Sequence, residues 1–537
     1  MKAISVLFGG RLEDEAFERL DIEGVPAGSG SFSLALAAAG RFPGVQKTVF
    51  FGVEGKAYPG LGPDVETALR PDWTQKSLLE ELSRLSASFD FAYFAWADCP
   101  LLDPGLASAL AERHTRYSAE YSYADGWPYG FAPELLAHET AGILAKMAGE
   151  EPVERDTLFN VIQKDINSFD IETEISPVDL RHYRLNLCAD SKRNLLLISR
   201  FLGAGFSSAS QAEAFIKDRP ELLRTLPAFF GIQVYGGCPQ ACRLCPYPVY
   251  GAGQAGDFAS RKDFMPKEQF TGLIDKIAGF AGDAVIDLSL WGELSLHPEK
   301  MELIDAVLSR PALSLIIETS GIGWKEDELR AIAGAAARAA PGKFYNGFRS
   351  RLSWIVSLDA HDPGRYKEVR GPGFPEAVSC AKTLLLLFPG DAYVQAVRVK
   401  GFEDDIEHFF RSWKGEEMAP GLSDAARKDG RHIIIQKYDD FAGALPKLQA
   451  TDLSPVKRRP CWHLTRDMNI LIDGAVPCCR EDLNALKGSA SLPLLGNALA
   501  EDLAVIWERG AARYLEHCRL EYNGICSLCD EYYAFNF

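Results

Sequence analysis

Three cysteines lie within eight residues of one short stretch, residues 235–248, whose sequence is YGGCPQACRLCPYP. Cys238, Cys242 and Cys245 have the spacing Cys-x3-Cys-x2-Cys. A disulfide cannot use three cysteines, and a zinc site normally brings Cys-x2-Cys pairs with a fourth ligand close by. Three thiolates on one tight loop suit a 4Fe-4S cube in which one iron has no protein ligand. The stretch therefore predicts a metal cluster with one open iron.

A regular alternation of strand and helix signals follows from about residue 229 onward. The predicted strands are FGIQVY (230–235), VIDLSL (285–290), LSLIIE (313–318), LSWIVSLD (352–359), AYVQAVRV (392–399) and HIIIQK (432–437). Helices are predicted behind Pro266 and at 328–340 and 375–388. Six strand–helix units predict a partial (β/α)6 barrel, in which reactive groups gather at the carboxyl ends of the strands. The cysteine loop follows the first strand and should lie there.

The cysteine spacing and the barrel pattern resemble the radical S-adenosylmethionine (radical SAM) superfamily. The resemblance implies that S-adenosylmethionine binds the open iron through its amino and carboxylate groups. Gly292 and Glu293 match the superfamily's Gly-Gly-Glu segment, with Trp291 in place of the first glycine, and would receive the methionyl ammonium. Ser357 and Arg370 would bind the methionyl carboxylate.

Two further contacts with the same cofactor are implied by this resemblance. Thr319 stands in the segment ETSG, which resembles the one that lines the ribose. The residue before the third cysteine is usually aromatic and stacks on adenine, but here it is Leu244, so Tyr247 is the alternative adenine contact. The implied reaction is reductive cleavage to methionine and a 5′-deoxyadenosyl radical that abstracts hydrogen from carbon. It needs a reductant such as flavodoxin or ferredoxin.

Six more cysteines gather near the C-terminus: Cys461, Cys478, Cys479, Cys518, Cys526 and Cys529. MNILIDGAV between them predicts a hairpin with an Asp-Gly turn. The pattern Cys-x12-Gly-x4-Cys with a late Cys-x2-Cys resembles the SPASM/Twitch extension. It implies an auxiliary 4Fe-4S cluster on Cys461, Cys479, Cys526 and Cys529, the second cluster of the chain, with Cys478 and Cys518 as alternative ligands. A structural zinc site on the same cysteines is the other interpretation. Asp482, Asp530 and Glu531 lie near these cysteines and are candidate proton acceptors.

The N-terminal third has apolar runs at residues 4–9, 46–52 and 90–96 with helical patterns between them. They predict a βαβ-type domain with a largely parallel sheet. Asp98 follows the third run, before a helix that starts near Pro104, which is a common place for a metal–phosphate group. These stretches resemble the sugar-nucleotide cytidylyltransferases of glycosyltransferase-A-like or Rossmann-like fold, so Asp98 would help to hold Mg²⁺. Only Arg11 and Arg19 stand where that family has an Arg-rich triphosphate loop, which favours a degenerate binding or scaffolding domain.

The chain has 537 residues, of which 47% are hydrophobic and 24% charged, with a net charge of −17. This composition is typical of soluble globular proteins and disfavours binding to nucleic acid or to an anionic membrane. The first ten residues predict a strand and not a signal peptide, so a cytoplasmic location is expected. In a reducing compartment clustered cysteines imply metal or catalysis. Cys99, Cys188 and Cys380 stand apart and are predicted to be core or loop residues.

The sequence as a whole predicts an α/β protein whose arrangement resembles the spiro-SPASM family. The expected domains are a cytidylyltransferase-like domain (1–204), a linker (205–228), a partial barrel (229–455) and a cysteine-rich extension (456–537). The expected function is a radical SAM oxidoreductase or maturase that acts on a peptide, protein or sugar-type substrate. The alternatives are a nucleotidyltransferase that joins CTP to a sugar and has structural clusters, and a non-catalytic binding protein.

Overall fold

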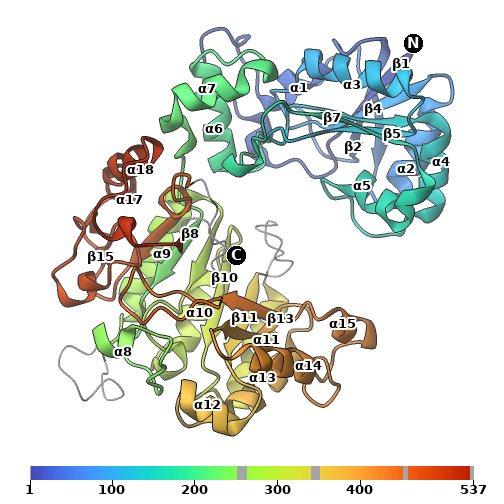
Figure 1. Ribbon diagram of the computed structural model, residues 1–537. Coiled ribbons are helices and arrows are strands. Elements are labelled where there is room, and N and C mark those ends of the chain that lie inside the picture. Colours follow the sequence, from blue (N-terminus) through green and yellow to red (C-terminus); the bar gives the residue numbers. More distant parts are fainter. Residues whose placement is uncertain (1, 251–262, 340–350, 451–457, 532–537) are drawn as a thin grey trace. The chain divides into compact units, whose positions relative to one another are not determined.

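The structure is a computed structural model that describes residues 2–250, 263–339, 351–450 and 458–531. It divides into two compact units, Met1–Thr225 and Leu226–Phe537 (Figure 1). Most of the predicted linker belongs to the first unit, where Phe206, Ala212 and Ile216 are buried in an apolar cluster. These apolar side chains are covered by the first unit and do not behave as a solvated connection. The predicted boundary at residue 455 lies outside the described residues.

The first unit is built on a seven-stranded sheet with the order β3-β2-β1-β4-β6-β5-β7. The three predicted apolar runs form its adjacent parallel strands β2, β1 and β4. Strand β6 alone runs antiparallel to its neighbours β4 and β5. Every residue of β1 and β4 is buried, as expected for strands that are covered on both faces. The bounds are β1 Ala3–Phe8, β2 Val45–Val53, β3 Glu66–Arg70, β4 Phe91–Trp96, β5 Tyr121–Asp125, β6 Glu134–Ala137 and β7 Ile171–Ile175.

Helices connect these strands, and their ends follow local capping signals. Helix α3 begins at Pro104, as predicted, because the Asp103 carboxylate accepts a hydrogen bond from Leu106 N at 2.8 Å and proline suits the first turn. The helices of the unit are α1 Ser31–Ala39, α2 Gln75–Ser86, α3 Pro104–Arg116, α4 His138–Met147, α5 Thr157–Ile162, α6 Lys192–Gly203 and α7 Ala212–Asp218.

The second unit contains a seven-stranded parallel sheet with the order β13-β12-β11-β10-β9-β8-β14. All six predicted strands are present and pair in sequence order, so the colours in Figure 1 run from green to orange across the sheet. The strands are β8 Phe229–Ile232, β9 Ala284–Asp287, β10 Leu313–Thr319, β11 Leu352–Ser357, β12 Ala392–Arg398, β13 Ile433–Lys437 and β14 Asp467–Ile470. The helices are α8 Tyr247–Tyr250, α9 Lys267–Ala281, α10 Lys300–Leu308, α11 Glu326–Arg338, α12 Pro363–Val369, α13 Phe374–Leu387, α14 Glu403–Trp413, α15 Asp424–Asp429, α16 His463–Arg466, α17 Leu503–Arg509 and α18 Ala511–Cys518.

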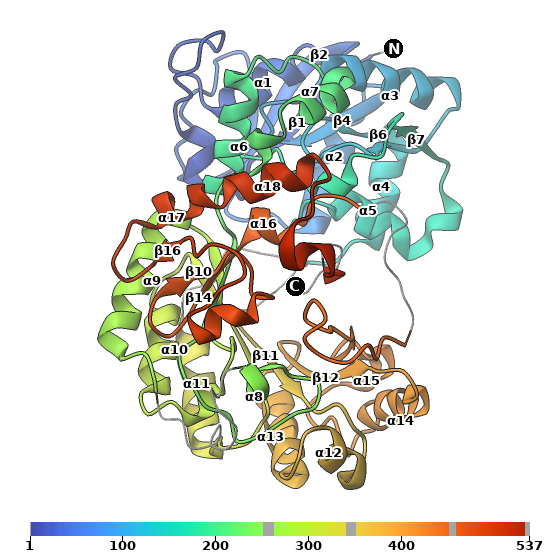
Figure 2. The same cartoon turned by 60° about the vertical axis from the view of Figure 1, so that its left-hand side comes forward.

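The predicted C-terminal hairpin is wrong in its strand pairing, although its turn forms. Leu471 N donates to Ala475 O at 2.8 Å, and Gly474 has the positive φ of 84° that the turn needs. Strand β14, however, pairs in parallel with β8, while β15 (Ala475–Val476) pairs with β16 (Gly496–Asn497). The open edge of β8 supplies backbone partners that local sequence does not show. The cysteine-rich extension is thereby joined to the strand that precedes the cysteine loop, and α17 packs beside α9 (Figure 2).

Among the described residues, no helix has the length and apolar character that crossing a membrane requires.

Candidate functional site

The cysteine loop follows β8 at the carboxyl end of the parallel sheet. Cys238, Cys242 and Cys245 all line one cavity of about 280 Å³ there. The loop is anchored to the end of α12, because Gln240 Nε2 donates to the Tyr366 hydroxyl at 2.7 Å and Arg243 N donates to Val369 O at 2.9 Å. This position is the one that parallel strand–helix folds give to their reactive groups.

The three thiols have raised pKa values in this cavity. Burial is the main cause, and it raises the pKa of Cys245 to about 12. The Glu293 carboxylate raises the pKa of Cys238 further, whereas the Arg370 guanidinium opposes the effect of burial at Cys242. Thiolates at these positions therefore need positive charge beside them, and bound iron would supply that charge.

The second strand end is fixed by a close backbone approach and a rigid carboxylate. A Cβ atom added to Gly292 would lie 1.9 Å from Tyr235 O, so only glycine fits. The Glu293 side chain is 3% exposed and accepts hydrogen bonds from Thr319 Oγ1 at 2.6 Å and from Ser320 N at 2.7 Å. These donors hold the carboxylate on the cavity wall and leave acceptor positions for a further donor.

Thr319, the predicted ribose contact, lines the cavity but its hydroxyl has internal partners. It donates to Glu293 and accepts a hydrogen bond from Trp324 Nε1 at 3.0 Å. The threonine therefore orients Glu293.

Ser357 and Arg370 also lie in the wall of this cavity, each held by a carboxylate. Ser357 Oγ donates to Glu318 Oε1 at 2.5 Å, and Arg370 Nη1 donates to Asp359 Oδ2 at 2.5 Å. Arg370 Nε donates to Gln240 of the cysteine loop at 3.1 Å. The sequence analysis missed Glu318 and Asp359, although both stand at strand ends, where a polar residue after a buried run is a signal.

Trp291 has a backbone conformation that normally favours glycine. Its φ is +49°, in the left-handed region, and it occupies the position where the superfamily has its first glycine. Its ring lies 6.2 Å from the Tyr247 ring at an interplanar angle of 28°, and 5.6 Å from the Phe441 ring. Trp291 thus adds a large aromatic surface to the cavity wall.

Tyr247, the predicted adenine contact, is only 2% exposed. Its hydroxyl donates to Gly236 O at 2.9 Å and accepts from Gln233 Nε2 at 3.1 Å. Since Tyr247 and Leu244 both line the cavity beside Trp291, an apolar and aromatic surface for a base is available although the residue before Cys245 is aliphatic.

Charged residues form the far wall of the cavity. Lys437, Asp439 and Arg480 were not predicted from the sequence, whereas Glu531 was a candidate proton acceptor. Lys437, at the end of β13, forms an ion pair with Asp530 at 2.9 Å and another with Glu531. Asp439 accepts a hydrogen bond from Phe441 N at 2.7 Å, and burial together with the neighbouring Glu481 raises its pKa. The raised pKa means that this carboxyl group holds a proton more readily than an exposed aspartate does.

A second, smaller cavity lies among the C-terminal cysteines. The residues that line it include Cys461, Cys478, Cys479 and Cys529. Cys526 is not among the described residues that line it. Burial, and to a lesser extent the neighbouring Cys526, raise the pKa of Cys461 to about 12. The structure thus places three of the predicted ligands, Cys461, Cys479 and Cys529, at this cavity together with the alternative ligand Cys478.

The other C-terminal residues of interest have different positions. Cys518 packs with Cys461 in a small apolar cluster. The Asp482 carboxylate accepts from Ser491 N at 3.0 Å and Leu492 N at 2.7 Å, so it holds a loop and lines neither cavity. Glu531 lines both cavities, as does Arg480.

Sulfur spacing tests whether these cysteines fit a cluster or a single ion. Among the described residues, neither cysteine set brings three sulfur atoms within 4.8 Å of one another. Sulfur ligands of a tetrahedral zinc ion at bond lengths of about 2.3 Å would be roughly 4 Å apart. Three sulfur atoms of either set would therefore have to move closer together to bind one zinc ion.

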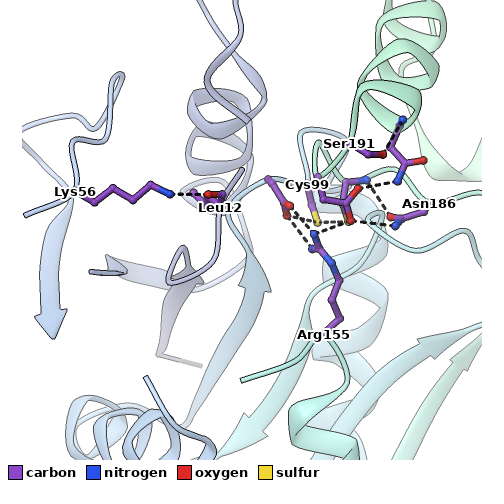
Figure 3. Close-up of polar contacts among 10 residues, drawn as sticks. Leu12, Lys56, Cys99, Arg155, Asn186 and Ser191 are labelled. Atoms are coloured by element: carbon purple, nitrogen blue, oxygen red, sulfur yellow. Dashed lines mark hydrogen bonds and ion pairs between the residues drawn. The ribbon is translucent and has the colours of Figure 1, made fainter. Parts of the chain in front are cut away.

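Asp98 in the first unit is paired with an arginine. The side chain is 1% exposed and accepts from Arg155 Nη1 at 2.9 Å and Nη2 at 2.6 Å, and Arg155 also contacts Asp190 at 3.0 Å. Figure 3 shows Arg155 reaching toward Cys99 and Asn186. Both oxygens that would bind the implied Mg²⁺ therefore face a guanidinium group, so the geometry does not support this role.

The remaining residues of the predicted triphosphate region offer little positive charge. Arg11 and Arg19 are exposed, and Lys56 Nζ donates to Leu12 O at 2.6 Å (Figure 3).

Cys99 and Cys188 are buried with their sulfur atoms 3.1 Å apart, and Cys380 is buried in the second unit, so the prediction of core residues is confirmed.

Replacing Arg155 with alanine is expected to lower the stability of the first unit by about 3–5 kcal/mol, since Asp98 would remain buried without its partner. Urea unfolding measures the change. Arg116→Ala is the control, because its ion pair with Glu112 is exposed and contributes little. A rise in melting temperature with Mg²⁺ that disappears in Asp98→Asn would instead support the divalent-cation role.

No protein family model matches the chain. An uncharacterized protein of Treponema pallidum is 37% identical to it over 389 residues, which cover 71% of this chain and 98% of that protein. The chain belongs to the same family as this Treponema protein.

Solved structures resemble parts of the chain at low similarity. SuiB of Streptococcus suis bound to S-adenosylmethionine has a TM-score of 0.38 and 14% identity, covering 62% of this chain and 80% of that one. BtrN in complex with AdoMet and 2-DOIA has a TM-score of 0.33 and 14% identity, covering 55% and 87%. A cytidylyltransferase from Leptospira borgpetersenii has a TM-score of 0.32 and 13% identity, covering 41% and 95%. Likenesses at this level do not assign a reaction, so the residues of the site have to support one by themselves.

Proposed function

We propose that this protein is a radical SAM enzyme that cleaves S-adenosylmethionine reductively and abstracts hydrogen from a peptide, protein or sugar-type substrate. One observation carries the proposal. Three cysteines of a single loop share a cavity with the carboxylate of Glu293 after β9, the hydroxyl of Ser357 at the end of β11 and the guanidinium of Arg370 at the end of α12. This set can hold a cluster with one open iron and, opposite it, a zwitterionic amino acid group.

The chain's own residues would bind and orient the cofactor. Cys238, Cys242 and Cys245 would ligate a 4Fe-4S cluster. Glu293, already fixed by Thr319 and Ser320, would accept hydrogen bonds from the methionyl ammonium, and Arg370 would face the methionyl carboxylate. Trp291 and Tyr247 would provide the surface for adenine. When bound and reduced, the cluster supplies the electron that cleaves the sulfonium C–S bond to give methionine and the 5′-deoxyadenosyl radical.

The far wall of the cavity supports oxidation of the substrate at carbon. Asp439 has a raised pKa and lines the cavity, so its carboxylate form is a good acceptor for a proton that the substrate releases. Arg480 and Glu531 line both cavities, which brings the C-terminal cysteines close to the substrate space. We propose that Cys461, Cys479, Cys526 and Cys529 hold an auxiliary 4Fe-4S cluster that accepts an electron, and that a flavodoxin or ferredoxin reduces the protein.

Nucleotidyl transfer is the weaker candidate. It needs a cation at Asp98 and a positively charged triphosphate site, but Asp98 is held by Arg155 and the opening loop is rich in acids. We therefore propose that the first unit binds or positions a ligand without transferring a nucleotide.

Anaerobic reconstitution with iron and sulfide, followed by iron analysis and a cleavage assay, tests the proposed function. We expect about eight irons per chain from two cubes, and 5′-deoxyadenosine after addition of dithionite and S-adenosylmethionine. Zinc in place of iron, or a fully loaded protein that forms no 5′-deoxyadenosine, would show that the proposal is wrong.

The auxiliary ligands are tested by a matched pair of variants. Cys526→Ala should leave about four irons, those of the cluster on the cysteine loop, whereas Cys478→Ala should keep about eight. Iron analysis after reconstitution measures both. The opposite result would assign the fourth ligand to Cys478, which lines the smaller cavity.

A further inference from the structure

The first unit contains a cavity of its own, of about 290 Å³. It lies where β4 ends, along β5 and at the start of β6, since Phe94 of β4 is opposite Glu134 of β6 in the sheet. The segment 126–133, between β5 and β6, contributes to its wall. No residue of this cavity takes part in the radical site proposed above, which belongs to the second unit.

Seven of the residues that line this cavity are aromatic. Tyr121 and Tyr123 have ring centroids 5.6 Å apart with nearly parallel planes, at 24°, and Phe159 lies 5.9 Å from Tyr123. Trp96, Trp127 and Tyr129 complete the aromatic surface. The faces of such rings carry partial negative charge, so several of them around one space attract a cation.

The charged groups of the wall all have the same sign. Asp125, Glu134 and Asp156 line the cavity, and among the described lining residues there is no lysine, arginine or histidine. Arg155 lies against the Trp96 ring at 4.5 Å, but its charge is matched by Asp98 and Asp190. Asp125 forms an ion pair with Arg181 at 3.0 Å, and Arg155 also lies 5.7 Å from the Tyr129 ring. A phosphate or nucleotide would still meet the acids Glu134 and Asp156 and π-electron density here.

The Glu134 carboxylate has an aromatic hydroxyl group as its partner. The Tyr121 hydroxyl donates a hydrogen bond to its carboxylate. Burial is the main cause that raises the pKa of Glu134 to about 7, and Asp156 adds to it. The carboxyl group lacks a cationic partner on this wall among the described residues, and an ammonium group in the cavity would supply one.

We propose that this cavity binds an organic cation, a ligand that carries an ammonium group, between the aromatic rings and the carboxylate of Glu134. The ammonium can belong to a small quaternary amine or to a basic side chain of a peptide, and both would be recognised by the same rings and carboxylates. The site would give the first unit a binding role that needs neither Mg²⁺ nor a nucleotide.

Calorimetric titration of the full chain with isosteric ligand pairs tests the proposal. Choline is compared with 3,3-dimethylbutan-1-ol, its neutral isostere, and Nα-acetyl-lysine amide with its Nε-acetylated form. We expect one cation or both to bind at least tenfold more tightly than the neutral counterpart, and the pair that shows this identifies the source of the ammonium. Equal affinity within both pairs, or no binding by either cation, would overturn the proposal. These comparisons use the unaltered protein, so they do not depend on a variant that folds.

Variants locate the site. Glu134→Gln keeps the shape of the side chain and should weaken binding of the cation at least tenfold. Glu172→Gln is the matched control. Glu172 lies on β7, outside the cavity wall, and forms an ion pair with Arg113 of α3. This variant should leave the affinity unchanged. Near-ultraviolet circular dichroism checks that both variants are folded. The proposed position would be contradicted if Glu172→Gln weakened binding of the cation. It would also be contradicted if folded Glu134→Gln bound the cation as tightly as the unaltered protein.

Discussion

Replacing Cys238 with alanine is expected to abolish formation of 5′-deoxyadenosine and to leave about four irons per chain after anaerobic reconstitution. Cys238 is one of the three cysteines that the loop after β8 places in the cavity at the carboxyl end of the sheet. With two ligands the loop would not retain a cube, while the C-terminal cysteines would keep theirs. Iron analysis and chromatography of the cleavage products measure the two effects separately.

The control for this variant is Cys380→Ala. Cys380 is a buried residue of α13 in the same unit and is not among the residues that line either cysteine cavity. It should keep about eight irons and full cleavage, so a general loss of folding can be told from loss of the cluster. If Cys238→Ala retained eight irons and its cleavage activity, the assignment of the cluster to this loop would be wrong.

Replacing Gly292 with alanine is expected to destabilise the second unit by more than about 3 kcal/mol and to disrupt the radical site. The new Cβ atom would lie 1.9 Å from Tyr235 O and 3.0 Å from the carbonyl carbon. These are backbone atoms at the start of the cysteine loop, so they cannot rotate away as a side chain would. The two backbone segments would have to move apart, and the hydrogen bond from Glu293 N to Gly237 O, which is 2.9 Å long, would be lost.

Gly272→Ala is the matched control. Gly272 lies on the exposed side of α9, and an added Cβ atom would meet nothing within 4 Å. Because alanine favours helix more than glycine, this variant should be more stable by about 0.5–1 kcal/mol. Urea unfolding compares the two, and iron analysis reports on the site. A Gly292→Ala protein within 1 kcal/mol of the unaltered one would contradict the close approach.

Local sequence was sufficient for six strands of the second unit and for the adjacent strands β1, β2 and β4 of the first. Most of the six predicted strands of the second unit are short runs of buried apolar residues between helical segments, as in β11, where every residue is buried. The edge strand β13 is half-buried and keeps the apolar run Ile433–Ile435. Capping chemistry placed the start of α3 at Pro104. The short strands β3, β5 and β7 were not predicted, since they contain exposed and polar residues whose pairing comes from neighbours distant in sequence.

The candidate site was predictable where residues follow strand ends. The cysteine loop, Glu293 and Ser357 meet in one cavity because the carboxyl ends of parallel strands lie at one edge of a sheet, and α12 brings Arg370 to the same cavity. Their hydrogen-bond partners were not predictable. Gln240 contacts Arg370 across 130 residues of chain.

The sequence by itself determined which residues of this protein are expected to bind metal, because the spacing of three cysteines on one loop is the same whatever surrounds it. Only the tertiary structure decided what the other polar residues do, since a charged group acts through its nearest partner and burial. Asp98 is the clearest case. Its motif implies a metal ligand, but folding brings Arg155, from 57 residues away, into contact with both of its oxygens. A guanidinium there satisfies the buried charge that a cation would otherwise have to balance.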